Sequence, residues 1–129
     1  MIEVYTDGAS SGNPGKSGAG IYIKANKQQQ YEYAFPLGEL SNHEAEFHAV
    51  IKALEICRKE FPDEILSFRS DSKIVVDTIE KDYTKNPTFI PLLEKIKEES
   101  SHFPYFFIKW IPEKKNNNAD KLARKAIQM

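Results

Sequence analysis

Residues 1–20 read MIEVYTDGASSGNPGKSGAG, in which a short apolar run is followed at once by an acid and a glycine-rich stretch. Apolar and polar side chains alternate along Met1–Thr6, a period of two that predicts a β-strand. Asp7–Gly20 holds most of the glycines of the chain, and the Asn-Pro-Gly sequence at residues 13–15 favours a turn. The segment therefore predicts a first strand that ends at Asp7, followed by a turn-rich loop.

The remaining residues predict four further strands and four helices. We expect strands over Ile21–Lys24, Gln30–Phe35, Ile65–Arg69 and Tyr105–Trp110, and helices over Glu44–Glu60, Asp71–Ile79, Pro91–Ser100 and Ala119–Ile127. The order is three strands, a helix, a strand, two helices, a strand and a helix. It predicts an α/β fold with a mixed five-stranded sheet, in which three antiparallel strands are followed by parallel additions and helices pack on the sheet.

The composition is that of an ordinary globular protein. A length of 129 residues predicts a single domain over residues 1–129, and a net charge of −1 points to no particular partner. Cys57 is the one cysteine, which excludes an internal disulfide, and its apolar helical surroundings predict a buried thiol. We see no signal peptide or membrane span, so we expect a cytoplasmic monomer.

Four acids on separate segments are the candidate functional residues: Asp7, Glu46, Asp71 and Asp120. Taken singly, each has a simpler explanation, as a strand terminator, a helix N-cap or an acid favoured by a helix dipole. Taken together, they predict a cluster, because burying several carboxylates costs free energy unless cations compensate. Ligands that are all oxygen atoms favour Mg²⁺ or Mn²⁺, the ions used in phosphoryl-transfer chemistry.

The choice of Glu46 over its neighbour Glu44 rests on helical spacing. Glu46 shares the apolar stripe of Ala49, Val50 and Ala53, which faces the sheet, whereas Glu44 is displaced around the helix. An acid on the core side of a helix requires an explanation that an acid on the solvent side does not. We therefore assign Glu46 to the cluster.

Five motifs, in order over nearly the whole chain, resemble type 1 ribonuclease H. They are Thr6-Asp7-Gly8-Ala9, Gly12-Asn13-Pro14-Gly15, Asn42-x-x-Ala45-Glu46-Phe47, Ser70-Asp71-Ser72 and Asn118-Ala119-Asp120-Lys121-Leu122-Ala123. The resemblance implies a ribonuclease H fold and cleavage of the RNA strand of RNA–DNA hybrids. It places the metal-binding and catalytic acids of the family on Asp7, Glu46, Asp71 and Asp120.

The same resemblance implies a mechanism with two Mg²⁺ ions, or Mn²⁺ as an alternative, roughly 4 Å apart across the scissile phosphate. Asp7 and Asp71 would support both ions, Glu46 the ion on the leaving side and Asp120 the ion on the attacking side. The resemblance also implies substrate contacts from Ser10, Gly12, Asn13 and Asn42, and we expect His43 and Lys73 to contact the nucleic acid as well.

The chain departs from the family pattern at several places. His43 stands where many members have a second asparagine, and Lys73 where a glutamine often follows the Ser-Asp-Ser motif. The loop Ile111–Asn118 lacks the histidine of many members, and Tyr83–Phe89 leaves no room for an inserted basic helix, so the chain is similar to the short members. These departures keep open an alternative function, a ribonuclease H-like module that binds hybrid or structured RNA and cuts poorly.

Aromatic side chains are concentrated between Phe103 and Trp110. They could stack on nucleic-acid bases, but alternation along a central strand favours burial in the core of the sheet. We therefore expect a core strand here.

Overall fold

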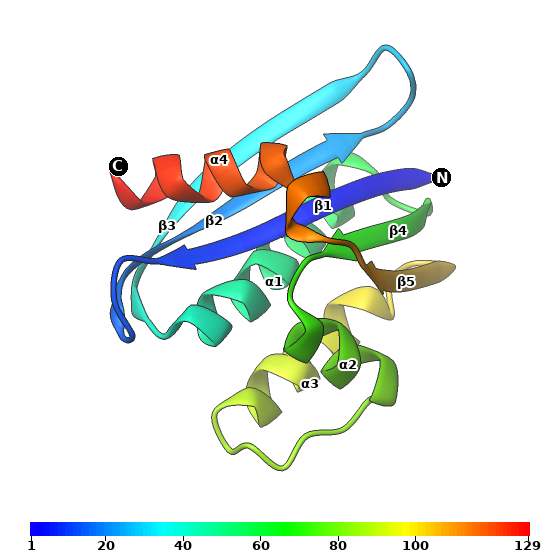
Figure 1. The fold of residues 1–129 in the computed structure, drawn as a ribbon. Coiled ribbons are helices and arrows are strands. Elements are labelled where there is room, and N and C mark those ends of the chain that lie inside the picture. Colours follow the sequence, from blue (N-terminus) through cyan, green and yellow to red (C-terminus); the bar gives the residue numbers. More distant parts are fainter.

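The computed structural model describes residues 1–129, and the order of its elements is the predicted one (Figure 1). The strands are β1 (Ile2–Ser10), β2 (Gly15–Lys24), β3 (Gln30–Leu40), β4 (Ile65–Ser70) and β5 (Tyr105–Trp110). The helices are α1 (Asn42–Glu60), α2 (Lys73–Lys81), α3 (Phe89–Ser100) and α4 (Asn117–Ile127), with a 3₁₀ turn η1 at Glu113–Lys115.

The five strands form one mixed sheet in the order β3-β2-β1-β4-β5. β1 pairs antiparallel with β2 and β2 with β3, whereas β1 pairs parallel with β4 and β4 with β5. This arrangement confirms the predicted mixed sheet. It pairs Thr6 of β1 with Ser70 at the end of β4, so Asp7 and Asp71, the residues that follow this pair, can meet.

The first two strands are longer than the sequence predicts. β1 continues past Asp7 to Ser10 and β2 begins at Gly15, so the expected loop shrinks to Ser11–Pro14. Glycine within a strand is locally unfavourable, so the glycine-rich segment Asp7–Gly20 predicts a loop. The prediction that Asp7 ends the first strand was therefore wrong.

The strand glycines are explained by close packing of a helix. An added Cβ would lie 2.6 Å from the carbonyl oxygen of Ala123 at Gly18, and 2.1 Å from that of Ala119 at Gly20. Both contacts are with α4, which crosses this face of the sheet at a distance that only a residue without a side chain permits. The glycines therefore let α4 approach β2.

α1 covers the opposite face and builds the main core with the inward side chains of the sheet (Figure 1). Its start is fixed by a capping box, in which Glu44 N donates to Ser41 Oγ at 3.2 Å and Ser41 N donates to Glu44 Oε1 at 3.0 Å. Cys57 is buried, as expected, and burial raises its thiol pKa to about 12. α2 begins later than predicted, because Ser72 is the N-cap and not Asp71.

α4 packs on β1, β2 and β3, and Figure 1 shows no helix over β4 and β5 on that side. β5 is one of the two edge strands of the sheet, so the expectation of a central strand was wrong. The expected burial is confirmed for Phe103, and Phe106 packs against the core. Ile108 is buried, but Tyr105, Phe107 and Trp110 are exposed. No helix has both the length and the apolar character needed to cross a membrane.

Candidate active site

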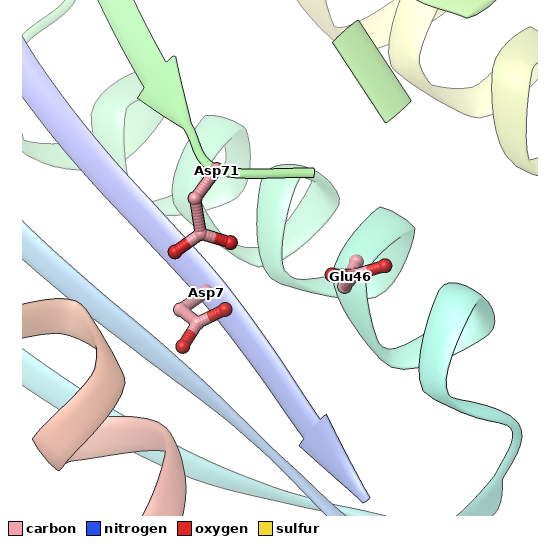
Figure 2. A group of neighbouring side chains, drawn as sticks. All are labelled: Asp7, Glu46 and Asp71. Carbon is pink, nitrogen blue, oxygen red and sulfur yellow. The ribbon is translucent and has the colours of Figure 1, made fainter. Parts of the chain in front are cut away.

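All four predicted acids line one cavity of about 630 Å³. Asp7 comes from β1, Glu46 from α1, Asp71 from the residue after β4 and Asp120 from the first turn of α4. One carboxylate oxygen from each of Asp7, Glu46 and Asp71 lies within 4.8 Å of the other two (Figure 2). Segments far apart in the chain thus bring three acids to one point, with the fourth beside them.

Gly8 explains how α1 reaches β1. An added Cβ at Gly8 would lie 2.2 Å from the carbonyl carbon of Ala45 and 2.4 Å from the backbone nitrogen of Glu46. These distances are far below any van der Waals contact, so the helix backbone rests directly on the glycine. The absence of a side chain next to Asp7 therefore brings the Glu46 carboxylate within range of the Asp7 carboxylate.

The Glu46 carboxylate is held by two side chains. Ser72 Oγ donates to Glu46 Oε1 at 3.1 Å, and His43 Nδ1 lies 3.0 Å from the same oxygen. Burial raises the pKa of Glu46, and the hydrogen bonds with His43 and Ser72 act in the opposite direction. Both partners contact the same carboxylate oxygen, Oε1, which fixes the orientation of this side chain.

The Asp71 carboxylate is oriented by a buried amide. Asn116 Nδ2 donates to Asp71 Oδ2 at 3.1 Å and to the backbone oxygen of Thr6 at 2.9 Å, and Asn116 is only 1% exposed. Trp110 Nε1 donates to the backbone oxygen of Asp71 at 3.1 Å. One asparagine therefore ties the acid after β4 to the backbone of β1, beside Asp7.

Asp120 lies outside the group of three but belongs to the same cavity. Arg124 Nε donates to both carboxylate oxygens of Asp120, at 3.2 and 3.1 Å, and the guanidinium group also lines the cavity. Glu113 of η1 is a fifth acid on the cavity wall. The cavity therefore carries five carboxylates and one guanidinium group, a strong excess of negative charge.

The pKa of Asp7 is raised by burial and by the negative charge of the cavity. Loss of solvation on burial, together with the nearby carboxylates of Asp71, Asp120 and Glu46, raises the pKa of Asp7 from 3.8 to about 9. Burial also raises the pKa of Asp71, which the amide of Asn116 partly offsets. Without a cation, the fully ionised cluster is therefore unfavourable. A donor set made only of carboxylate oxygens fits a hard divalent ion.

The predicted substrate-binding residues divide into two groups. Ser10 and Asn42 line the cavity with the acids, whereas Gly12, Asn13, His43 and Lys73 do not. Asn13 Oδ1 accepts a hydrogen bond from Asn42 N at 3.1 Å, which ties the β1–β2 turn to the start of α1. His43 contacts Glu46, and the Lys73 ammonium group lies 5.3 Å from the centre of the Trp110 ring.

Two residues with a role at the site were missed from the sequence, Asn116 as a polar loop residue and Trp110 as a core aromatic. Three consecutive asparagines precede Asp120, and nothing in their spacing distinguishes Asn116 from its neighbours. Only burial does so, because Asn116 is enclosed while Asn117 and Asn118 are exposed. The contact of Trp110 with Asp71 depends on β4 and β5 ending side by side.

We expect Asn116→Ala to weaken divalent-metal binding by about 10- to 100-fold, because groups that orient metal ligands contribute effects of that size. The substitution removes the donor to Asp71 Oδ2 and leaves this carboxylate free to rotate. Isothermal titration with Mn²⁺ measures the change. Asn117→Ala, at the exposed neighbouring position, is the matched control, and equal affinity of the two variants would contradict a positioning role for Asn116.

Comparisons with known proteins agree with this geometry. The RNase H family model matches residues 1–128. A protein named "Putative hydrolase EbsB" from Enterococcus faecalis is 44% identical over 129 residues, which cover 99% of this chain and 95% of that protein. Ribonuclease HI from Halobacterium salinarum is 29% identical over 98% of this chain, which spans 64% of that protein.

Solved structures show the same fold. The crystal structure of RNase H1 from Halobacterium salinarum superimposes with a TM-score of 0.92 at 29% identity, covering 98% of this chain and 97% of that one. The structure of LC11-RNase H1 in complex with an RNA/DNA hybrid superimposes with a TM-score of 0.92 at 33% identity, covering 99% of this chain and 97% of that one. Because the family match spans almost every residue, the acid cluster lies within the matched region. The chain belongs to the RNase H family.

Proposed function

We propose that residues 1–129 act as a single monomeric hydrolase that cleaves the RNA strand of RNA–DNA hybrids with Mg²⁺ as cofactor. The observation that carries the proposal is the meeting of the Asp7, Glu46 and Asp71 carboxylates within 4.8 Å. The structure of the relative LC11-RNase H1 with an RNA/DNA hybrid supports the choice of substrate. The family match supports hydrolysis as the reaction.

Asp7, Glu46, Asp71 and Asp120 would hold two divalent ions. When bound, such ions activate water and stabilise the charge that develops on the departing oxygen. The protein contributes by holding the metal-binding carboxylates in place. Asn116 fixes Asp71, and Ser72 and His43 fix Glu46.

Polar side chains beside the acids in the same cavity are suited to recognising RNA. The 2′-hydroxyl group distinguishes RNA from DNA, and it can both donate and accept hydrogen bonds. Ser10 and Asn42 present a hydroxyl and an amide beside the acids. We propose that these two side chains read 2′-hydroxyls near the scissile bond, and that Lys73 contacts a phosphate of the hybrid from its position over Trp110.

The test is cleavage of an end-labelled RNA–DNA hybrid in Mg²⁺ and in Mn²⁺, beside an RNA duplex and a DNA duplex of the same sequence. We expect cuts in the RNA strand of the hybrid alone. The alternative function, a module that binds hybrid and cuts poorly, is favoured by the absence of histidine from Ile111–Asn118. Retained hybrid binding without cleavage in either metal would establish that alternative.

We expect hybrid binding to weaken strongly with salt, because each neutralised phosphate contributes a slope of about −0.9 in log K against log salt concentration. Lys73→Ala is expected to lower the slope by about one contact. Fluorescence anisotropy in chelator, at several salt concentrations, gives both slopes. Lys81→Ala, an exposed lysine at the other end of α2, is the control. Affinity independent of salt would contradict phosphate contacts altogether.

A further inference from the structure

One half of the sheet surface on the α4 side is covered by no helix. We call it the open face and define it by six residues: Tyr5, Lys24, Arg69, Tyr105, Phe107 and Lys109. We infer that the open face binds single-stranded nucleic acid, by stacking of bases on its aromatic rings and by contacts between phosphates and its basic groups. This site is separate from the acid-lined cavity, and binding to it does not require cleavage.

The register of the sheet places these side chains on one surface. Arg69 is the strand partner of Lys109 on one side and of Tyr5 on the other, and Tyr5 is in turn paired with Tyr22. Directly paired residues point to the same side of a sheet. The side is that of α4, since Gly20 on the same face of β2 lies under the helix. Figure 1 shows no helix over β4 and β5 on this side of the sheet.

The aromatic rings at the edge of this surface are open to solvent. Tyr105 is 64% exposed and Phe107 is 39% exposed, and their ring centres lie 6.0 Å apart. Large exposed apolar side chains side by side on an edge strand are a liability for a protein unless something covers them. Planar rings with free faces are the groups on which bases stack in proteins that bind single strands.

The charges of the open face select a polyanion as its occupant. Lys24 Nζ lies 5.9 Å and the Arg69 guanidinium carbon 5.3 Å from the centre of the Tyr5 ring, which arranges cations around an aromatic plane. The one acid within this arrangement, Glu3, is neutralised by Arg69 at 2.8 Å. Lys109 adds a further exposed cation, and Glu32, which is paired with Tyr22, lies on the same side of the sheet but on β3, two strands from Tyr5. The whole chain has a net charge of −1, so this positive surface is a local feature.

The open face lies next to the candidate active site, with Asn116 between them. Tyr5 and Asp7 lie two residues apart on β1, about 7 Å along the strand and on the same side of the sheet. A second cavity of about 90 Å³ begins at Tyr5 and is also lined by Lys24, Lys115 and Asn116. Asn116 is the residue that orients Asp71. An unpaired extension of a nucleic acid held at the acids can therefore run onto the open face.

Binding of short fluorescein-labelled oligonucleotides, measured by anisotropy in chelator at low salt, tests the inference. Oligo(dT) and oligo(rU) of about 12 nucleotides are the two probes, a length within the range of known single-strand sites. We expect both to bind, since stacking and phosphate contacts are common to DNA and RNA. The double variant Tyr105→Ser/Phe107→Ser is expected to lose about 10-fold or more in affinity. Lys109→Glu is also expected to weaken binding, and its difference in affinity from the unmodified protein should grow as the salt concentration is lowered.

Matched controls separate the open face from general effects. Tyr83→Ser changes an exposed aromatic between α2 and α3, and Lys59→Glu changes an exposed lysine at the end of α1. Both should bind the probes as the unmodified protein does. Thermal unfolding checks that each variant is folded. If the double variant does not fold, Lys109→Glu, at an exposed strand position, tests the inference in its place. Preferential binding of one probe would assign the site to RNA or to DNA.

Three results would overturn the inference. They are no binding of either probe, equal losses in the control variants, and self-association of the chain that the double variant abolishes while probe binding stays intact. Sedimentation velocity measures the last of these and would make a second copy of the chain the occupant of the open face. Failure of hybrid cleavage alone leaves the anisotropy result unchanged, so it tests the active site and not this surface.

Discussion

Asp71→Asn is expected to abolish cleavage of the RNA strand, with a fall in rate of at least about 10³-fold, comparable to or larger than the loss of one preorganised electrostatic group. Asp71 contributes one of the three carboxylates that lie within 4.8 Å, and Asn116 holds it in place. An amide has the same shape but no charge, so it leaves the cavity intact while weakening metal binding. Single-turnover cleavage of a labelled hybrid in Mg²⁺ measures the effect.

The control for this substitution is Asp77→Asn, which removes the same charge from an exposed position on α2. It should cleave the hybrid at the rate of the unmodified protein. Hybrid binding by Asp71→Asn in chelator should persist, because phosphate contacts and not the acids supply the affinity. An Asp71→Asn variant that cleaves within a few-fold of the unmodified protein would remove Asp71 from the catalytic group.

Asp7→Asn is expected to stabilise the metal-free protein by several kcal/mol at about pH 8, while it abolishes cleavage. The pKa of Asp7 is raised from 3.8 to about 9 in the folded protein, first by burial and then by the charge of Asp71. The folded state therefore keeps a proton that the unfolded state releases. An uncharged amide at this position removes the penalty.

The direction of the pH dependence follows from this difference in bound protons. Because the pKa of Asp7 is higher in the folded than in the unfolded chain, its contribution to stability is complete below about pH 4 and is lost as the pH rises toward about 9. Urea unfolding in chelator, at about pH 5 and about pH 8, should show the unmodified protein losing stability over this window. Asp7→Asn should lose much less.

Divalent metal should reduce the difference in stability between the two proteins. An ion bound only by the folded state stabilises it by about 2.7 kcal/mol at a concentration 100 times its Kd. Mg²⁺ should therefore raise the stability of the unmodified protein and leave that of Asp7→Asn nearly unchanged. Asp77→Asn should follow the unmodified protein. If Asp7→Asn were less stable than the unmodified protein without metal, the acid would be a structural group and not part of a repulsive cluster.

The sequence by itself determined the order of the elements and the four acids that line the cavity. Periodicity shows the elements, because a strand or helix with one buried face must repeat apolar residues at its own spacing. The four acids follow from their places beside these segments and from the resemblance to type 1 ribonuclease H. Helical spacing also separated Glu46 from Glu44, and the structure places Glu46 in the cavity and Glu44 in the capping box. These features depend on neighbours within one segment.

The tertiary structure alone decided what depends on contacts between segments. Glycine discourages strand formation locally, and only the close approach of α1 and α4 explains why Gly8 and Gly20 lie within strands. Asn116 is indistinguishable from its neighbours until burial between β1 and Asp71 selects it. The order of the strands put the aromatic β5 at the edge, because pairing with β4 leaves it no second partner. Long-range packing carries no periodicity, so the sequence contains no local signal for it.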